Sequence, residues 1–314
     1  MIEFTCNICG MANRASEKLD REKPSCASCG SNVRFRGLME ALSLELFGAR
    51  LAIADFPRIK SVRGMGLSDS KSYADRLAQK LDYRNTFYTR EPRLDIANPP
   101  AEEFGKYDFL LSSEVFEHVA GPVEAAFECA LRLLKPHGFL LLTVPYSFEA
   151  ATAEHFADMH HLGLAKVGDQ MVLVGRSAEG DIKTFEHPIF HMGVSGPALE
   201  MREFSEAGLR RVLLAAGFSE VAIHKDDYLP FGVARAETWS LPVAARKAPF
   251  AFRREAAQEV VEQWAALRKH FRELGGEFWV RLGFKLRLID RRRYFIRREH
   301  GMEPNAAESD PMLP

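Results

Sequence analysis

The sequence predicts an α/β protein with a Rossmann-like, mostly parallel sheet and helices on both faces. From about residue 50 to 224, short strand-like runs alternate with amphipathic helical runs, which is typical of βαβ units. Closely spaced cysteine pairs near the amino terminus indicate an added small module, and a long helical pattern near the carboxyl terminus indicates an extension. We therefore expect a cysteine module with a connecting helix over 1–48, the sheet domain over 49–228 with an insertion at 148–200, and an extension over 229–314 with a disordered end.

Composition narrows the class of protein. The chain has 314 residues, enough for one large domain and an accessory module. Lys plus Arg is 42 against 43 for Asp plus Glu, so the overall charge gives no strong signal for nucleic acid. The most apolar stretch, 139–145, is too short to span a bilayer, and the first ten residues lack a signal-peptide pattern. We expect a cytoplasmic protein with reduced thiols and no transmembrane segment.

The amino-terminal cysteines have the spacing of a structural zinc site. Cys6, Cys9, Cys26 and Cys29 form two C-x2-C pairs, each followed directly by a glycine. A two-residue gap lets both thiolates of a tight turn point at one ion, and the glycine relieves the turn backbone. Four thiolates close the coordination shell, so the expected zinc is structural. A redox pair is the alternative, and Cys129 is expected to be a packing residue on a helix.

The central region predicts the following succession of elements. Strands are expected over 61–69, 85–89, 106–114 and 139–145, and helices over 70–82 and 121–138, the latter with Pro122 near its start and Gly138 just past its end. In open parallel sheets, ligands bind outside the carboxyl ends of the strands. The polar residues to expect at that edge are Asp69, Asp95, Ser112, Ser113 and Glu114.

Two segments resemble class I S-adenosylmethionine-dependent methyltransferases. The stretch KYDFLLSSEVFEHV, followed by LLKPHG and an apolar strand, is similar to the family's fourth strand, next helix and fifth strand. Downstream, MREFSEAGLRRVLLAAGFSEVAIHKDD is similar to the family's closing helix and strand. The resemblance covers about residues 60–225. It implies S-adenosylmethionine as cofactor and methyl transfer to a small-molecule or glycan acceptor.

The glycine-rich loop of that family is altered in this chain. Its usual form is an acid, any residue, and then G-x-G, but Val62 stands where the acid is expected before Gly64 and Gly66. We therefore favour a register in which 64–69 is the second strand and 46–57 a degenerate first strand. The resemblance then implies that Asp69 accepts the ribose hydroxyls and Asp95 faces the adenine amino group, side by side at the sheet edge. Gly64, Gly66, Ser112 and Glu114 complete the expected cofactor site. A dinucleotide site, or a helix N-cap role for Asp69, is the alternative.

Histidines concentrate in and before the insertion. Seven of the ten lie between His118 and His191. Because the insertion follows the fifth strand, we expect it to overhang the sheet edge as an acceptor pocket and lid, with a hairpin over 171–187 that turns at 178–180. The expected catalytic or positioning residues are His155 and His160, together with Glu117 and His118 near the methyl group. A second metal site built from His155, His160, His187 and His191 is an open alternative.

The carboxyl-terminal extension predicts an irregular connection and then a helix. The helix is expected over 252–276, with Val260, Trp264, Leu267 and Phe271 on one stripe. The basic stretch 281–298 is a candidate for weak contact with an anionic surface.

Two competing functions stay open alongside methyl transfer. The altered glycine loop allows a zinc-stapled binding protein on a methyltransferase scaffold that has lost catalysis. The histidine cluster allows a metal-dependent enzyme. The sequence indicates neither the acceptor nor the oligomeric state.

Overall fold

A computed structural model describes residues 1–15, 18–157, 159–168, 170–177, 179–186, 188–193 and 196–276. The chain divides into a compact unit over Met1–Ala256 and a second unit from Ala257 onward. The second unit contains most of helix α5 (Arg254–Gly276), which confirms the predicted long helix. His187, the basic stretch 281–298 and the end of the chain lie outside the described residues.

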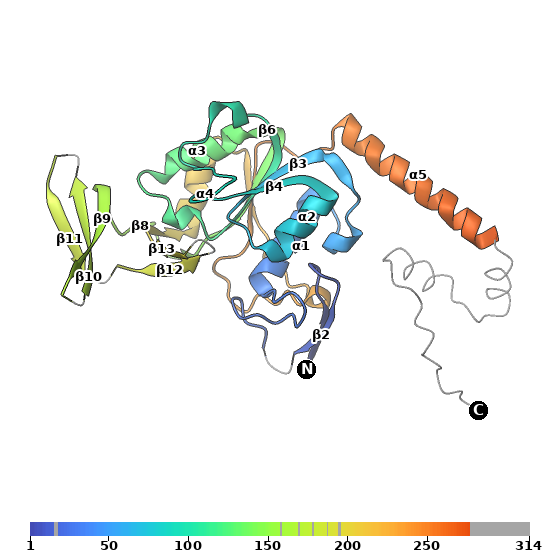
Figure 1. The fold of residues 1–314 in the computed structure, drawn as a ribbon, viewed down its shortest axis with the longest axis horizontal. Helices are drawn as coiled ribbons and strands as arrows, with labels where there is room; N and C mark the ends of the chain where they lie inside the picture. Colours follow the sequence, from blue (N-terminus) through green and yellow to red (C-terminus); the bar gives the residue numbers. More distant parts are fainter. Residues whose placement is uncertain are drawn as a thin grey trace. The chain divides into compact units, whose positions relative to one another are not determined.

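A six-stranded sheet forms the centre of the first unit, in the order β15-β16-β6-β5-β3-β4 (Figure 1). Four neighbouring strands of this sheet, β6, β5, β3 and β4, run parallel to one another. The bounds of the six strands are β3 (Ile59–Leu67), β4 (Leu81–Thr86), β5 (Tyr107–Ser113), β6 (Leu134–Thr143), β15 (Glu220–Ile223) and β16 (Val243–Arg246). Strand β16 pairs antiparallel with both β6 and β15. The predicted mostly parallel α/β fold is therefore confirmed.

The strand register differs from the one that the sequence favoured. Strand β3, which contains Gly64 and Gly66, lies between β4 and β5, so it is the first parallel strand along the chain. The strand expected over 46–57 is absent. That segment holds the end of helix α1 (Val33–Phe47) and a short 3-10 helix, η1 (Ile53–Asp55). Gly48 ends α1 with a φ of 64°, and the rings of Phe47 and Phe56 pack on each other, so the apolar residues fill a core instead of a sheet.

The sheet also extends past residue 228, where the sequence predicted an irregular connection. Strand β16 lies within that connection and fills the place between β6 and β15. Ala244 and Ala245 are fully buried there. The pattern of a four-residue strand between prolines is too short to be distinguished from a linker in the sequence. Its pairing partners, moreover, are distant along the chain.

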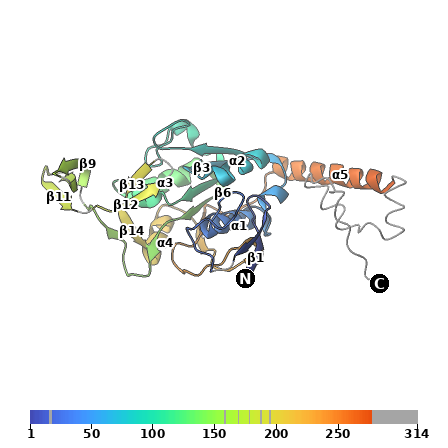
Figure 2. The same ribbon diagram turned by 60° about the horizontal axis from the view of Figure 1, so that its bottom comes forward.

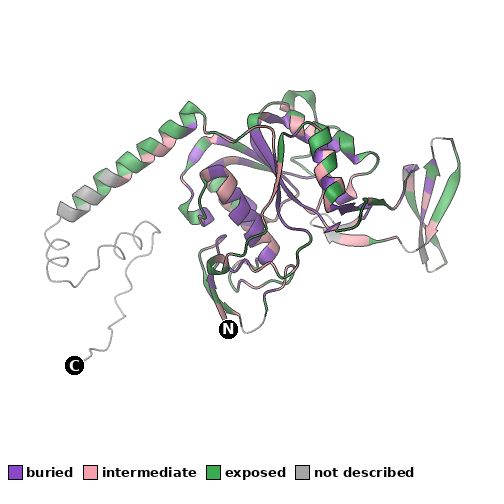
Figure 3. Cartoon of the chain, turned by 180° about the vertical axis from the view of Figure 1, so that it is seen from behind, coloured by how far each residue is buried: buried purple, intermediate pink, exposed green. Residues whose placement is uncertain are grey.

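Helices cover both faces of the sheet (Figure 2). Helices α3 (Val123–Leu133) and α4 (Glu206–Ala215) contribute to one core with the sheet residues Leu110 and Leu140. Helix α1 contacts β6 on the other face, and helix α2 (Lys71–Lys80) joins it there because the ring of Phe35 packs on that of Tyr73. The strands between these layers are largely buried (Figure 3). Helix α3 ends before Lys135, so Gly138 lies inside β6 and not at a helix end.

The amino-terminal module contains a two-stranded antiparallel sheet, β1 (Ile2–Thr5) and β2 (Ala12–Ala15). It docks on the short helix η4 (Leu229–Phe231) of the first unit. The buried guanidinium of Arg36 donates to the carbonyl of Gly232 at 2.9 Å, and the ring of Phe4 lies against the same glycine. The module is therefore anchored to the sheet domain by buried contacts.

The insertion after β6 consists of short strands. They are β7 (Tyr146–Ser147), β8 (Ala153–Glu154), β9 (Met159–Val167), β10 (Gln170–Ser177), β11 (Ile182–Glu186), β12 (Phe190–Gly193), β13 (Gly196–Leu199) and β14 (Arg202–Ser205). The pairing of β10 with β11 confirms the predicted hairpin. Strand β14 pairs with both β7 and β8, which closes the insertion at its base.

Arg202 ties that base to the loop after β5. Its buried guanidinium donates to the carbonyls of Phe116, Val119 and Gly121 and pairs with Glu154. These bonds fix the short 3-10 helix η3 (Phe116–His118); a further 3-10 turn, η2, spans Ala101–Glu103. Within the described part of the chain, no helix combines the length and apolar character needed to cross a bilayer.

Candidate functional site

Three non-glycine residues with left-handed backbones mark the carboxyl edge of the parallel strands. Ser68 follows β3 with a φ of 59°, and Glu114 follows β5 with a φ of 56°. Ser240 precedes β16 with a φ of 57°, and because β16 runs antiparallel to β6 it lies at the same edge. Such a backbone costs roughly 1–2 kcal/mol per residue and clusters at functional sites in other proteins. The strain identifies this edge as the candidate site.

Two arginines from the amino-terminal part of the chain reach this edge. Arg21 donates to Glu114 at 2.9 Å and also contacts Ser240. Arg34, on α1, contacts the hydroxyl of Ser113 and pairs with Glu22 at 2.8 Å. The edge therefore joins the cysteine module, β5 and the segment before β16 through charged hydrogen bonds.

The arginines keep Glu114 ionised. Burial alone would raise the pKa of its carboxyl, but the charges of Arg21 and Arg34 lower that pKa below its usual value. Glu114, predicted to belong to the cofactor site, lies at the strand edge, where Arg21 pairs with it and the charge of Arg34 acts on it. Ser112, also expected there, lies inside β5; it is fully buried, and its hydroxyl has no hydrogen-bond partner among the described residues.

Asp69 is enclosed and not presented at the edge. Its side chain is 1% exposed, and its two carboxylate oxygens accept hydrogen bonds from the hydroxyls of Tyr73 and Tyr83. Its backbone exchanges hydrogen bonds with the side chain of Asn85 at 2.8 and 2.9 Å. Burial raises the pKa of the Asp69 carboxyl to about 6 although both tyrosines lower it. The expected role of Asp69 as an open ribose acceptor does not match this arrangement, because α2 and β4 already satisfy the carboxylate.

The two glycines of the altered loop also serve packing. Both lie within β3 and not in a loop after it. A Cβ on Gly64 would collide with the ring of Phe109, and a Cβ on Gly66 would collide with the hydroxyl of Tyr83 and the carboxylate of Asp69. Their lack of a side chain makes room for these protein atoms, so the structure gives them no open face toward a cofactor.

Asp95 remains open to a ligand. It follows a loop that bridges Phe87 at the end of β4 to Arg93, and it is half-buried. One carboxylate oxygen accepts the backbone N–H of Ala97 at 3.0 Å, which fixes the side chain in a turn. No strand ends at Asp95, contrary to expectation. Between β4 and Asp95 the chain forms one isolated bridge, which pairs Phe87 with Arg93, and no strand.

The hollow at the strand edge is small. Arg21, Arg34, Thr143, Trp239 and Ser240 are among the residues that line it, and its enclosed space is about 20 Å³. Pockets for small molecules measure roughly 300–1,000 Å³. The guanidinium groups that line the hollow can pair with an anionic group. The side chains of the hollow must move to admit a small molecule.

The loop after β5 also carries two of the expected catalytic residues. Glu117 is fully buried, and its Oε1 lies 3.7 Å from Nε2 of His118. Nδ1 of His118 lies 2.9 Å from the carbonyl oxygen of Leu199, so Nδ1 must carry the proton and donate it. Burial lowers the pKa of His118 and raises that of Glu117 well above its usual value. His118 is therefore a neutral imidazole with a lone pair on Nε2.

Glu200 joins two histidines of the insertion to this loop. Its carboxylate oxygens lie 2.8 Å from Nε2 of His155 and 2.8 Å from Nε2 of His191. The rings of His118 and His191 are 5.5 Å apart and nearly perpendicular. The alternative second metal site consisted of His155, His160, His187 and His191. Of these, His155 and His191 lie here, whereas the side chain of His160 and the whole of His187 lie outside the described residues.

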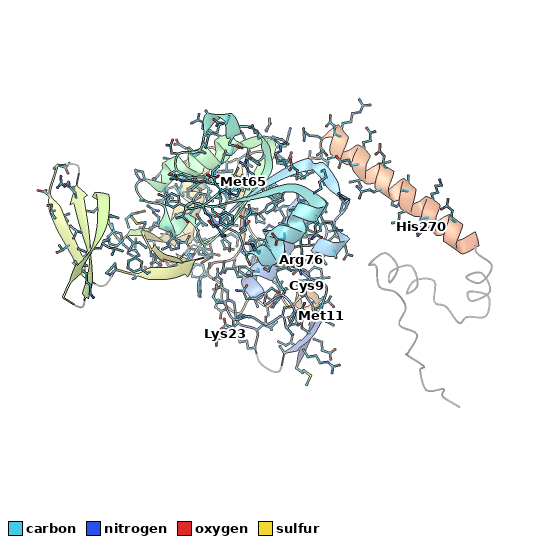
Figure 4. All side chains as sticks on the ribbon, in the orientation of Figure 1. Cys9, Met11, Lys23, Met65, Arg76 and His270 are labelled. Carbon is cyan, nitrogen blue, oxygen red and sulfur yellow. The ribbon has the colours of Figure 1, made fainter. Side chains whose placement is uncertain are left out.

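The four amino-terminal cysteines converge as predicted. Their sulfur atoms all lie within 4.8 Å of one another, with Cys6 3.7 Å from Cys29 and Cys9 3.5 Å from Cys26. A tetrahedral zinc ion with bonds of about 2.3 Å needs neighbouring sulfurs about 3.8 Å apart. Cys9 is labelled in the amino-terminal module in Figure 4, well apart from Met65 on β3. The cysteine geometry therefore fits one ion.

The surroundings of the cysteines fit an anionic centre. Gly10 and Gly30 adopt φ values of 79° and 67° and donate to the carbonyls of the first cysteine of each pair. Arg36 is fully buried beside the cluster and bonds only neutral oxygens, including the carbonyl of Ser31 at 2.8 Å. Burial lowers the pKa of Arg36, while the nearby thiolates raise it. A zinc tetrathiolate carries two net negative charges, one of which this guanidinium would neutralise.

Arg21, Arg34, Ser240 and Glu200 were not predicted as site residues from the sequence. Ser240 fell in the segment that was predicted to be an irregular connection. No local pattern identifies these residues, because each reaches the site across 45 to 219 positions of the chain.

Comparisons with known proteins found one matching family model and several similar solved structures. A family model described as a methyltransferase domain matches residues 64–222. Solved structures with similarity include an S-adenosylmethionine-dependent methyltransferase from Mesorhizobium loti, with 14% identity, coverage of 70% of this chain and 100% of that one, and a TM-score of 0.39. The 1,6-didemethyltoxoflavin-N1-methyltransferase of Burkholderia thailandensis has 12% identity, covers 76% and 94%, and has a TM-score of 0.35.

A putative S-adenosylmethionine-dependent methyltransferase from Listeria monocytogenes has 11% identity, covers 68% of this chain and 98% of its own, and has a TM-score of 0.39. No curated protein has significant sequence similarity to the chain. The matched segment begins within β3 and ends within β15, so it includes the strands whose carboxyl ends form the candidate site. It also spans just over half of the chain, and the protein therefore belongs to the methyltransferase domain family.

Proposed function

We propose that the protein transfers a methyl group from S-adenosylmethionine to a small-molecule or glycan acceptor. The observation that carries the proposal is the position of the three strained residues, Ser68, Glu114 and Ser240, at the carboxyl edge of the strands. Ser68 and Glu114 lie within the family match, and Ser240 lies just beyond it at the same edge. Strain that is retained at a ligand-binding edge is better explained by a working site than by packing.

Asp95 and the two arginines are the residues that we assign to the cofactor. Asp95 would accept a hydrogen bond from the adenine amino group, and Arg34 or Arg21 would pair with the amino acid carboxylate. The bound cofactor would supply a methyl group that its sulfonium charge has already activated. The protein then mainly has to align the acceptor and exclude water.

The acceptor side of the site would be formed by the loop after β5 and by the histidines of the insertion. His118 offers an unprotonated Nε2, and Glu117 lies next to it. His155 is held by Glu200 and is half-buried, so it is suited to positioning. The unprotonated Nε2 of His118 can accept a proton from a hydroxyl or ammonium acceptor.

We further propose that the cysteine cluster holds a structural zinc ion. Its four thiolates would leave no open coordination position, and its module anchors Arg21 and Arg34, which reach the strand edge. Zinc binding by reduced thiols is consistent with the cytoplasm.

Calorimetric titration with S-adenosylhomocysteine tests the cofactor assignment. Asp95→Asn is expected to weaken binding at least tenfold, about 1.4 kcal/mol, because an amide is a poorer acceptor than a carboxylate. Asp75→Asn, at an exposed position on α2, is the matched control and should leave the affinity unchanged.

The same titration separates the enzyme from the inactive scaffold. If the wild-type protein does not bind S-adenosylhomocysteine at millimolar concentration, the chain is a scaffold and the proposal is rejected. If it binds but Asp95→Asn binds equally well, the adenine assignment is wrong while methyl transfer stands. Methylated products in extracts, compared by mass spectrometry with and without the protein, would then identify the acceptor.

A further inference from the structure

A cluster of two imidazoles and a carboxylate lies where the insertion meets the loop after β5. One ligand atom each from Glu117, His118 and His191 lies within 4.8 Å of the other two. Glu117 and His118 belong to η3, whereas His191 belongs to β12 of the insertion. The backbone N–H of Met201 donates to the carbonyl of Glu117 at 2.9 Å, so the two segments are joined next to the cluster.

Within the described part of the chain, Glu117 has no hydrogen-bond partner that would explain its burial. Its side chain is fully buried, and neither carboxylate oxygen has a hydrogen-bond partner among the described residues. Leaving a buried polar group unpaired costs about 1–3 kcal/mol, and more if the group is charged. Burial and the negative charges of Glu114 and Glu200 disfavour its ionisation, whereas its own backbone N–H and the charge of Arg34 favour it. A positive ion next to Glu117 would remove this penalty.

His118 is already oriented as a metal ligand. Its Nδ1 donates to the carbonyl of Leu199 at 2.9 Å, which leaves the Nε2 lone pair on the side of Glu117, 3.7 Å from Oε1. Metal-bound histidines in proteins commonly donate their other ring nitrogen to a carbonyl or a carboxylate in this way. Two oxygen or nitrogen ligands of one tetrahedral ion lie about 3.3 Å apart, so closure requires only a small movement.

His191 shows the same arrangement with a carboxylate partner. Its Nε2 lies 2.8 Å from Oε2 of Glu200, and a donated proton there leaves Nδ1 with a lone pair. Glu200 is held in turn by His155 at 2.8 Å. His118 thus has one nitrogen bonded to the protein and a lone pair on the side of Glu117, and His191 has one nitrogen bonded to Glu200.

We propose that Glu117, His118 and His191 bind a divalent transition-metal ion of the zinc and iron(II) class. Two imidazoles and one carboxylate suit these ions, and three protein ligands leave at least one position for water or an acceptor oxygen. This inference rests on the proposed function, because the bound ion would hold the methyl acceptor. The Nε2 lone pair of His118 would then bind the ion, and His118 would not act as the base. The site is separate from the cysteine cluster in ligands and in chemistry.

Cobalt(II) titration of the full-length protein, after its removable metal has been dialysed away, tests the site. We expect two ions per chain, one with the sulfur charge-transfer absorption of a thiolate site and one without it. Glu117→Gln, which keeps the shape of the side chain, should weaken the second ion at least tenfold and leave the thiolate ion unchanged. His191→Ala, at a half-exposed position, should have the same effect and guards against misfolding of the buried variant.

Matched controls separate the site from adventitious binding. His137→Ala removes an exposed imidazole outside the cluster and should leave both ions bound. A single ion per chain in the wild-type protein, or a second ion that persists in Glu117→Gln and His191→Ala, overturns the proposal and makes Glu117 a neutral buried acid. S-adenosylhomocysteine binding, measured on the same samples, reports the proposed function independently, because its failure leaves the metal count unaffected.

Discussion

At the scale of single residues, the partners of each carboxyl group distinguish structural acids from acids of the candidate site. Asp69 is satisfied by two tyrosine hydroxyls, whereas Glu117 has no hydrogen-bond partner among the described residues. Glu114, which is half-buried, is ionised because Arg21 pairs with it and the charge of Arg34 acts on it. Three acids that look alike in the sequence therefore have three different physical roles.

The raised pKa of Asp69 predicts a pH dependence of stability. Its carboxyl has a pKa of about 6 in the folded protein, above the value of about 3.9 for an unfolded chain. The unfolded state therefore loses its proton first, and the contribution of Asp69 to stability is fully present at low pH and declines as the pH rises to about 6. Relative to Asp69→Asn, the wild-type protein should lose about 1 kcal/mol of unfolding free energy between about pH 5 and pH 7.

Urea unfolding of both proteins across that range measures the difference. Effects of the cysteine cluster on pH dependence cancel because both proteins contain it. A difference between the two proteins that stays constant with pH would show that Asp69 is ionised in the folded state throughout.

At the scale of elements, the cysteine module also helps to position residues at the strand edge. Its two turns gather four sulfur atoms, and the chain that follows them carries Arg34 to the strand edge on the first turns of α1. Arg36, two positions later, is buried beside the sulfurs and fixes the helix to Gly232. Loss of an ion from the module is thus expected to disturb the site as well as the module.

Zinc removal should destabilise the first unit. A strong chelator, or Cys9→Ser, is expected to lower the melting temperature and release one equivalent of zinc from the thiolate site, because the polar module has no large core of its own. Cys129→Ser, which removes a half-buried thiol on α3, is the control and should retain that zinc. Differential scanning calorimetry with metal analysis checks both, and unchanged melting of the zinc-free protein would contradict a structural role.

At the scale of the whole molecule, the contacts divide the chain near residue 256. The sheet, its covering helices, the cysteine module and the insertion all belong to the unit that ends at Ala256. The strand β16 belongs to it too, although it follows the family match by about twenty positions. The folded unit is therefore larger than the methyltransferase segment at both ends.

A chain that ends at Ala256 should fold and bind like the full protein. We expect its unfolding free energy to change by less than about 1 kcal/mol, or about 2–4 °C in melting temperature. Its affinity for S-adenosylhomocysteine should equal that of the full chain. Truncation at residue 228, which removes β16 and uncovers the edges of β6 and β15, is the contrasting variant and should not fold. Equal stability of the two truncated chains would refute the boundary.

Local sequence patterns were sufficient to predict several elements. Each cysteine pair forms its turn because a two-residue gap and a glycine act locally, although the two pairs meet across 17 to 23 positions of the chain. The alternating strands and helices follow from hydrophobic periodicity. The hairpin of β10 and β11 and the long helix α5 belong to the same class. Each of these predictions depends on residues that are near neighbours in the chain.

Which residues meet at the site depends on contacts between distant segments of the chain. Strand order rests on pairing between distant segments, so the place of β3 beside β5 could not be derived from Gly64 and Gly66 alone. That pairing enclosed Asp69 between α2 and β4, and it brought Arg21 to Glu114 across 93 positions. Local sequence determines the elements because their hydrogen bonds are local, whereas the site consists of contacts that exist only after the sheet has closed.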